Sequence, residues 1–236
     1  MAISNALLKT VEITLDTIFK ASGSDIRVHG TVNVPNHPVL YVVNHFTRME
    51  TFLMPYIIRK SIKKYPISLA FEEFFSGKMG DFMDRVGAVS TADPKRDIIL
   101  TGSLLTDRHP VIIFPEGQMI KDKKIIEKGK FMVYNTGIRR PPHTGAARLA
   151  LISQLVREKI RHFHSKGDLE KIKIYAAHFG FDESDLEKIV SSETYIVPVN
   201  ITYYPIRARD NAIQKLAGRL VKGISDRFRE ELEVEG

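Results

Sequence analysis

The stretch Val39-Leu40-Tyr41-Val42-Val43-Asn44-His45-Phe46-Thr47-Arg48-Met49-Glu50 sets the pattern for the chain around it. Its first five residues are apolar and rich in β-branched and aromatic types, which predicts a buried strand. Asn44-His45 ends that strand, and a helical pattern follows from about residue 48 to 64. Open α/β sheets bind their ligands at the C-terminal ends of the strands. His45 therefore lies where such a sheet would have its ligand-binding or active site.

The spacing from His45 to Glu50 has a chemical reading and a structural one. A carboxylate one turn into the following helix can reach back to the imidazole and fix its tautomer, as a general base requires. The same two residues also fit a His that caps the helix and a Glu that is solvated. This stretch alone leaves both readings open.

Apolar and polar residues along the rest of the chain predict alternating strands and helices. Further strands are expected near residues 26–28, 67–71, 87–90, 111–114 and 195–203. Further helices are expected at residues 80–85, 94–107 and 145–165, with residues 168–190 helical or mixed and interrupted at Gly180. This alternation predicts an α/β fold, a single domain with a mainly parallel, twisted sheet covered by helices on both faces. Pro198 cannot donate to a ladder, so it places the last strand at an edge or a bulge.

An N-terminal amphipathic helix is expected ahead of the α/β domain, so that residues 1–24 precede a domain of residues 25–236. The apolar positions of residues 3–19 share one helical stripe. Such a helix either packs on the domain or lies in a membrane interface. It has no Trp and only Lys9 and Lys20 for lipid headgroups, which favours packing. Gly23 is the expected C-terminal cap.

Composition restricts the classes of partner and compartment. The 236 residues include no cysteine, which excludes disulfides and thiolate metal sites and fits a reducing compartment. No apolar run approaches the roughly 18 residues of a membrane span, and the N-terminus lacks the features of a signal peptide. We therefore expect a cytoplasmic protein. Its net charge of +7 indicates an anionic partner, either a phosphate ligand, an acidic carrier, a membrane surface or a nucleic acid.

The positive charge is concentrated in two places. Residues 121–140 hold seven basic residues against two acidic ones, a net charge of +5, within a long basic loop expected at about 118–144. Loops of that length inside a domain are usually functional or mobile. Residues 59–64 hold Arg59, Lys60, Lys63 and Lys64 and no acid. The chain shows no sequence signature of a nucleic-acid-binding fold, so we expect no nucleic acid as partner.

Four stretches, taken in order, resemble motifs of the glycerolipid acyltransferase family, of the 1-acylglycerol-3-phosphate acyltransferase type. The first motif, Asn-His, four residues and Asp, is similar to Asn44-His45 and Glu50. The second, with its Glu, Phe and glycines, is similar to Glu73-Phe74-Phe75, Gly80 and Gly87-Ala88-Val89. The third is intact as Phe114-Pro115-Glu116-Gly117, and the fourth as Val197-Pro198-Val199. The family's helix start after the third motif also appears, at Gly145-Ala146-Ala147. The resemblance covers residues 26–205, and four ordered motifs are far more specific than one.

The chain departs from the family at the carboxylate of the first motif and at two arginines that the family associates with the acceptor's phosphate. Glu50 replaces the family's Asp, and Gln118-Met119-Ile120 replaces Thr-Arg-Ser after Gly117. About six residues after Gly87, where the family has an Arg, this chain has Asp93, with Arg96 just beyond. The resemblance thus supports acyl transfer better than it supports a lysophosphatidate acceptor.

The resemblance implies an O-acyltransferase that moves a fatty acyl group from a thioester carrier to a hydroxyl of a glycerolipid or related acceptor. His45 would be the catalytic base and Glu50 its partner. Substrate would be bound by Asn44, Phe114, Pro115, Glu116 and Gly117, with Arg96 and Lys121 supplying charge for phosphates. No cofactor or metal is expected. His162 and His164 have a possible metal spacing, but surface histidines are the commoner outcome.

The expected partners are acyl-CoA or an acyl-carrier protein as donor, a lipid acceptor, and a membrane surface to which the protein is peripheral. Two alternatives stay open. One is a non-catalytic homologue that binds lipid or acyl carrier, which the missing phosphate arginines would fit. The other is thioester hydrolysis, in which water replaces the alcohol at His45.

Overall fold

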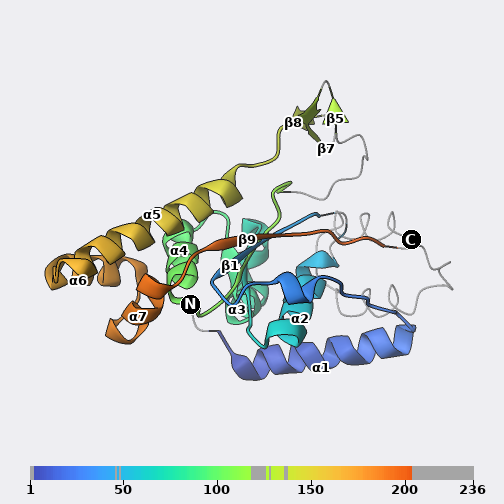
Figure 1. Ribbon diagram of the computed structural model, residues 1–236. Coiled ribbons are helices and arrows are strands. Elements are labelled where there is room, and N and C mark those ends of the chain that lie inside the picture. Colours follow the sequence, from blue (N-terminus) through green and yellow to red (C-terminus); the bar gives the residue numbers. More distant parts are fainter. Residues whose placement is uncertain are drawn as a thin grey trace.

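A computed structural model describes residues 3–45, 47, 49–117, 126–127, 129–135 and 138–203. The central element is a sheet of five parallel strands in the order β3-β2-β4-β1-β9. Its strands are β1 (Val39–Val43), β2 (Ile67–Ala70), β3 (Ala88–Ser90), β4 (Val111–Ile113) and β9 (Tyr195–Val199). The expected α/β fold with a parallel sheet is confirmed (Figure 1).

Seven α-helices are present in the described part of the chain. They are α1 (Asn5–Ser22), α2 (Glu50–Ile62), α3 (Gly77–Arg85), α4 (Arg96–Thr106), α5 (Gly145–Ser165), α6 (Leu169–Phe179) and α7 (Glu183–Ser191). Two short 3₁₀ turns, η1 (Thr31–Asn33) and η2 (Glu72–Phe75), complete the main elements. Gly180 separates α6 from α7 in the left-handed conformation, as the interruption in the sequence pattern predicted.

Helices cover both faces of the sheet because successive strand side chains point to opposite sides. Leu40 of β1 packs with Leu104 of α4 and Leu149 of α5 on one face. Tyr41, the next residue, packs with Leu53 and other residues of α2 on the other face. Strands buried on both sides explain the unbroken apolar run of residues 39–43.

The N-terminal helix α1 packs on α2, which is the outcome that its sequence favoured. The Phe19 and Tyr56 rings lie 5.4 Å apart, edge to face, and Lys60 Nζ lies 2.8 Å from an Asp16 oxygen. Ser4 caps its first turn, and Gly23 ends it with a φ of 66°. Gly23 is therefore the C-terminal cap that the sequence indicated.

Helices α4, α5, α6 and α7 form a second packed layer in which one buried cation joins two helix ends. The Arg157 guanidinium of α5 is fully buried and donates to the carbonyls of Leu104 and Ile189, at 2.8 and 2.7 Å. These carbonyls lie in the last turns of α4 and α7, where the helix dipole favours a positive charge. Burial lowers the pKa of Arg157 to about 10, so the group stays charged at neutral pH.

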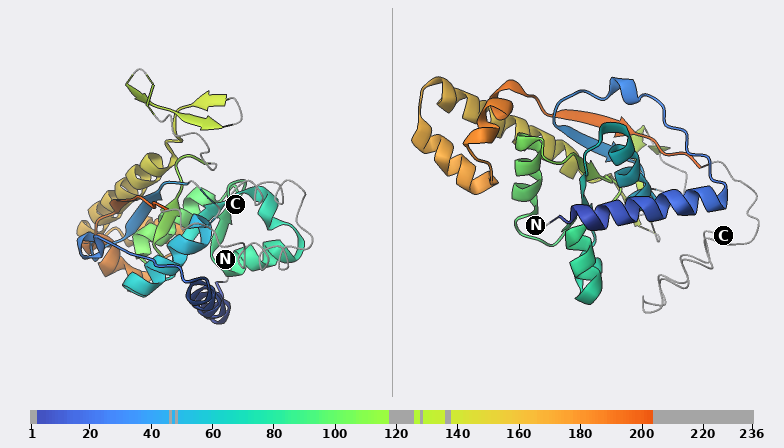
Figure 2. Two further views of the ribbon diagram at one scale, coloured as in Figure 1. Left: turned by 90° about the vertical axis from the view of Figure 1, so that its right-hand side faces the viewer. Right: turned by 90° about the horizontal axis from the view of Figure 1, so that it is seen from below.

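Two expectations about local structure need correction. Residues 26–28 were expected to form a strand, but the backbone there pairs with no strand among the described residues. Ile26 instead packs against the core cluster that includes Leu53 and Met54 of α2. The expected irregular loop of residues 118–144 contains two short antiparallel pairs, β5 (Ile126–Glu127) with β6 (Lys130–Phe131) and β7 (Val133–Asn135) with β8 (Ile138–Arg140). Figure 2 shows these hairpins projecting away from the body of the domain.

Candidate active site

The strand register brings the first and third sequence motifs together at one edge of the sheet. Strands β1 and β4 are neighbours and parallel, with Val42 opposite Ile113. His45 and Glu116 each follow three residues later, so both lie just beyond the C-terminal ends of adjacent strands. This edge is where open parallel sheets bind ligands. Residues 71 positions apart in the chain thus meet because of topology.

Glu50 holds the His45 imidazole at its Nδ1 atom. The distance from Nδ1 to Glu50 Oε2 is 3.1 Å, and the Glu50 side chain has no exposed surface. Both Glu50 oxygens also accept the Thr47 backbone N–H, at 3.0 and 2.8 Å. An ionised carboxylate can only accept, so Nδ1 carries the hydrogen and donates a hydrogen bond to Glu50. The lone pair then lies on Nε2, the tautomer that a general base needs.

The chain between His45 and Glu50 makes the close approach of these two side chains possible. Glu50 is the first residue of α2, and Thr47 lies in the turn just before it. Thr47 Oγ1 accepts the Met49 N–H at 3.1 Å, which closes the turn. Because the acid stands at a helix N-terminus, the helix dipole favours its negative charge.

The His45 ring is supported by an aromatic side chain and still reaches the surface. Its centroid lies 4.6 Å from that of Phe114, with the planes tilted by 31°. The His45 side chain is 15% exposed, so it is not sealed inside aliphatic packing. A substrate hydroxyl can therefore approach the imidazole from outside.

Glu116 is 4% exposed and lies in a tight turn after β4. Gly117, with a φ of 66°, donates its N–H to the Phe114 carbonyl at 3.0 Å, and the His143 N–H binds the Pro115 carbonyl at 2.8 Å. The turn requires the left-handed backbone that glycine adopts without strain. Burial raises the pKa of Glu116, while its own amide, the His45 imidazole and the His45 backbone N–H act to lower it. Glu116 is thus electrostatically coupled to His45.

Asn44 uses both ends of its side-chain amide within the protein. Its Oδ1 accepts the Ile201 N–H at 2.7 Å, and its Nδ2 donates to the Ile201 carbonyl at 2.9 Å. We expected Asn44 to bind substrate, and the structure places its amide on the chain that follows β9.

Arg96 lies at the same sheet edge, at the start of α4 and on the far side of β2 from the His45 loop. Its guanidinium donates to the Thr91 carbonyl and, from Nε, to Asp97 at 3.3 Å, and its side chain is 40% exposed. Lys121, the other residue expected to contact phosphate, lies outside the described residues.

The second basic cluster is largely neutralised by acids. Arg59 and Lys60 pair with Glu12 of α1 at 3.7 and 3.2 Å. Lys64 pairs with the buried carboxylate of Asp107. Residues 59–64 therefore hold α1 and the C-terminal end of α4 in place, and they leave the region of 121–140 as the main basic segment.

His162 and His164 are exposed on α5. Over the residues that the structure describes, no three His, Asp or Glu side chains gather as a metal site would require. Nor does any described helix combine the length and the apolar character needed to cross a membrane.

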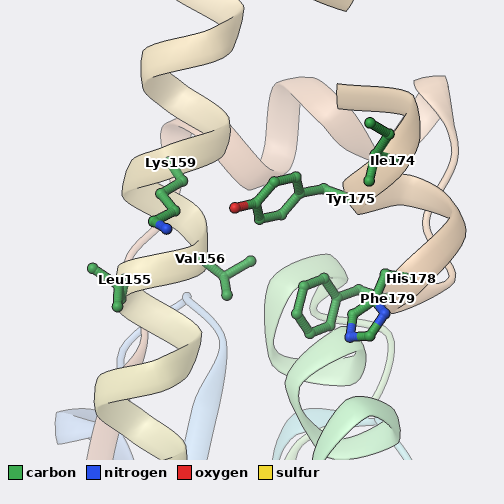
Figure 3. A pocket seen from close by; sticks show the side chains of 7 residues that line it. All are labelled: Leu155, Val156, Lys159, Ile174, Tyr175, His178 and Phe179. Atoms are coloured by element: carbon green, nitrogen blue, oxygen red, sulfur yellow. The ribbon is translucent and has the colours of Figure 1, made fainter. Parts of the chain in front are cut away.

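Two surface cavities lie apart from His45 and Glu116. One of about 390 Å³ lies between α5 and α6, where Lys159 and Tyr175 point toward one another above an apolar floor that includes Val156 and Phe179 (Figure 3). Another of about 680 Å³ lies beside the edge strand β3, with Phe75 and Asp93 among its lining residues. Neither includes a residue of the first or third motif.

Thr47, Ile201 and Tyr203 belong to the site but carried no signal in the sequence. Thr47 donates its amide to Glu50, and its hydroxyl donates to Tyr203 Oη at 3.2 Å. Ile201 and Tyr203 follow the fourth motif, Val197-Pro198-Val199, and that proximity was the one available hint. Partners 156 and 157 residues apart cannot be paired from sequence spacing.

Comparison with known protein families gives a match to the acyltransferase family over residues 25–202. No curated protein and no solved structure matches the chain. The matched range contains β1, β2, β3, β4 and β9, and with them Asn44, His45, Thr47, Glu50 and Glu116.

Proposed function

Because this chain belongs to the acyltransferase family, the family of glycerolipid acyltransferases, we propose that it moves a fatty acyl group from a thioester carrier to a hydroxyl of a glycerolipid or related acceptor. The observation that carries the proposal is the His45–Glu50 pair, which engages Nδ1 and leaves the lone pair on Nε2 of a partly exposed side chain. Its donor would be acyl-CoA or an acyl-carrier protein, and no cofactor is needed for this chemistry.

The reaction requires one proton to be moved twice. His45 Nε2 takes the proton of the acceptor hydroxyl as its oxygen attacks the thioester carbonyl. The tetrahedral intermediate then collapses, the carbon–sulfur bond breaks, and the imidazolium returns the proton to the leaving thiolate. Glu50 stabilises the imidazolium while it exists, through the 3.1 Å contact at Nδ1. No protein nucleophile is consumed, since the acceptor's own oxygen attacks.

The remaining roles concern substrate placement. We propose that Glu116 accepts a hydrogen bond from an acceptor hydroxyl, with Phe114, Pro115 and Gly117 shaping the turn that presents it. Arg96 and the basic segment of residues 121–140 would meet the phosphates of the donor or the acceptor. Both lie after strands of the same sheet, and the alternative cluster at residues 59–64 is engaged in ion pairs.

We place the protein in the cytoplasm, peripheral to a membrane surface that presents the lipid acceptor. The net charge of +7 favours anionic lipid surfaces. Helix α1 turns Glu12 and Asp16 toward α2, where they meet Arg59 and Lys60. Its basic side chains Lys9 and Lys20 remain exposed.

The test is release of free thiol from acyl-CoA with a panel of lysophospholipid and alcohol acceptors. His45→Ala should lower the rate by about 10²- to 10⁴-fold, the usual contribution of a general base. His162→Ala, the same change at an exposed site on α5, is the matched control and should leave the rate unchanged. Retained turnover in His45→Ala would exclude the mechanism.

Two other outcomes identify the alternatives. Thiol release that does not depend on the acceptor would indicate thioester hydrolysis. Silence across the panel together with binding to liposomes would indicate a non-catalytic lipid-binding homologue, which the missing phosphate arginines favour.

A further inference from the structure

We infer that Asn44 is a positioning residue for the reaction, one that holds His45 in place by clamping the loop after β1 to the chain after β9. The inference rests on the proposed function for its kinetic consequence and on geometry alone for the clamp itself. It also gives Asn44 a different role from the substrate contact that its place in the motif suggested.

The clamp continues the sheet beyond the point where backbone pairing stops. Strands β1 and β9 pair in register from Val39 opposite Tyr195 to Val43 opposite Val199. The next two residues of the β9 side bring Ile201 level with the His45 loop. There the Asn44 amide forms a cyclic pair with the Ile201 peptide unit, with bonds of 2.7 and 2.9 Å. Both lengths are those of well-formed hydrogen bonds.

The residue that Asn44 grips is itself fixed. The Ile201 side chain is 9% exposed and packs in the core cluster that contains Tyr41, Val43 and Leu53. The anchor point is therefore part of the domain core, although it lies beyond the last strand. Asn44 transmits that rigidity to His45 through a single peptide bond.

The His45 ring contacts Glu50 at the start of α2 and Phe114 after β4, so its imidazole is held from two elements of the domain. Neither of these contacts involves the chain after β9. The Asn44–Ile201 pair connects the loop after β1 to this chain, and the hydroxyl bond from Thr47 to Tyr203 does so at a second point, at 3.2 Å. Two attachments to the β9 extension also define where Nε2 lies relative to substrate. A displacement of about 1 Å at a reacting group can cost about 10²-fold in rate.

The experiment compares Asn44→Ala, Asn44→Asp and Asn200→Ala. Asn200→Ala is the matched control, because the exposed Asn200 amide donates to a near neighbour in the chain, Thr202 Oγ1, at 3.1 Å. The first measurement is the exchange rate of the Ile201 amide hydrogen, followed by NMR. The second is kcat and KM for thiol release from oleoyl-CoA in the presence of a lysophospholipid.

In Asn44→Ala we expect the Ile201 amide to exchange at least about tenfold faster, the change that corresponds to losing one hydrogen bond. We expect kcat to fall about 10- to 100-fold, with KM for oleoyl-CoA within about threefold of the wild-type value. Asn44→Asp keeps an acceptor for the Ile201 amide, so that amide should stay protected. Its kcat should lie between those of Asn44→Ala and the wild type. Asn200→Ala should match the wild type in both measurements.

Three results would overturn the inference. An unchanged exchange rate in Asn44→Ala would show that the clamp does not exist in solution. Faster exchange with wild-type kcat would show that the clamp does not position His45. A raised KM with unchanged kcat would return Asn44 to substrate binding. If the wild type transfers no acyl group, the proposed function fails and the kinetic role with it, while the exchange rate still decides whether the clamp exists.

Discussion

Replacing Glu50 by Gln tests the central geometry with almost no change in side-chain shape. Glu50 accepts the Thr47 amide with both oxygens, at 3.0 and 2.8 Å, and the His45 Nδ1 hydrogen at 3.1 Å. Oε2 accepts from both donors, and Oε1 accepts from the Thr47 amide. Gln has a single acceptor oxygen, so its NH₂ group takes the place of one of these two oxygens.

Both orientations of the Gln amide carry a cost. If its oxygen takes the Oε1 position, it keeps the Thr47 amide, the NH₂ group faces Nδ1 of His45, and Nδ1 becomes an acceptor. The imidazole proton then moves to Nε2, where the base should be. If the oxygen takes the Oε2 position, it still accepts from both His45 and Thr47, but the NH₂ group then faces the Thr47 N–H at the 3.0 Å position of Oε1, at a cost of about 1–3 kcal/mol. In this orientation the negative charge that stabilises the imidazolium is also lost.

We expect kcat of Glu50→Gln to fall by about 10³- to 10⁴-fold, as when the orienting carboxylate of a catalytic triad becomes an amide. The melting temperature should fall by only roughly 2–10 °C, since at most a few kcal/mol of packing and hydrogen bonding is lost. The assay is thiol release from acyl-CoA with circular dichroism on the same samples. Glu158→Gln, an acid-to-amide change at an exposed position of α5, is the matched control.

A folded Glu50→Gln protein with a rate within about threefold of the wild type would refute this reasoning. It would mean that Glu50 neither selects the His45 tautomer nor stabilises the imidazolium, and the pair would then be structural.

Other consequences concern stability. A Cβ on Gly102 of α4 would lie 2.1 Å from the Phe179 carbonyl oxygen. Gly102→Ala should therefore lower the melting temperature by roughly 4–8 °C, which corresponds to about 2 kcal/mol. Gly145→Ala is the control, because a Cβ there meets nothing within 4 Å, and equal melting temperatures of the two variants would disprove the close approach. Arg157→Ala should cost about 3–5 kcal/mol in urea unfolding, because it strands buried carbonyls at the ends of α4 and α7; a cost below about 1 kcal/mol would show that water replaces the guanidinium. Burial raises the folded-state pKa of Glu116, so the folded state binds its proton more tightly than the unfolded state, and this residue's contribution to stability should grow as pH falls from 7 towards 4.5. Urea midpoints of wild type and Glu116→Gln at pH 7 and 5 measure this, and a wild-type midpoint that falls relative to the variant on acidification would contradict it.

Several features of the fold followed from local chemistry. Gly23 and Gly180 end helices because only glycine enters the left-handed conformation without strain, and both do so here. Pro198 marked an edge strand because it lacks an N–H, and β9 is indeed at the edge of the sheet. The run at residues 39–43 indicated a strand buried on both faces, and β1 lies between β4 and β9.

Two predictions of local structure were wrong, because strand pairing in the tertiary structure, and not the local sequence pattern, decides whether a short segment forms a strand. Residues 26–28 look like a strand, but they pair with no strand among the described elements. The segment after Glu116 looked irregular because its strands are only two or three residues long. Gly129, with a φ of 74°, provides the turn of one hairpin, and its sequence context alone did not reveal the pairing.

The sequence by itself determined the parallel α/β architecture and the chemical types at the site, since hydrophobic period and motif spacing are local properties of the chain. The His45–Glu50 pair could be predicted from the sequence, because the two residues are only five positions apart, at the end of one strand and the start of the next helix. Only the tertiary structure decided that β4 lies beside β1, which brings Glu116 to His45, and that β9 lies on the other side, which gives Asn44 its grip on Ile201. Strand order depends on the burial of whole faces against many helices at once, and no short stretch of sequence contains that information.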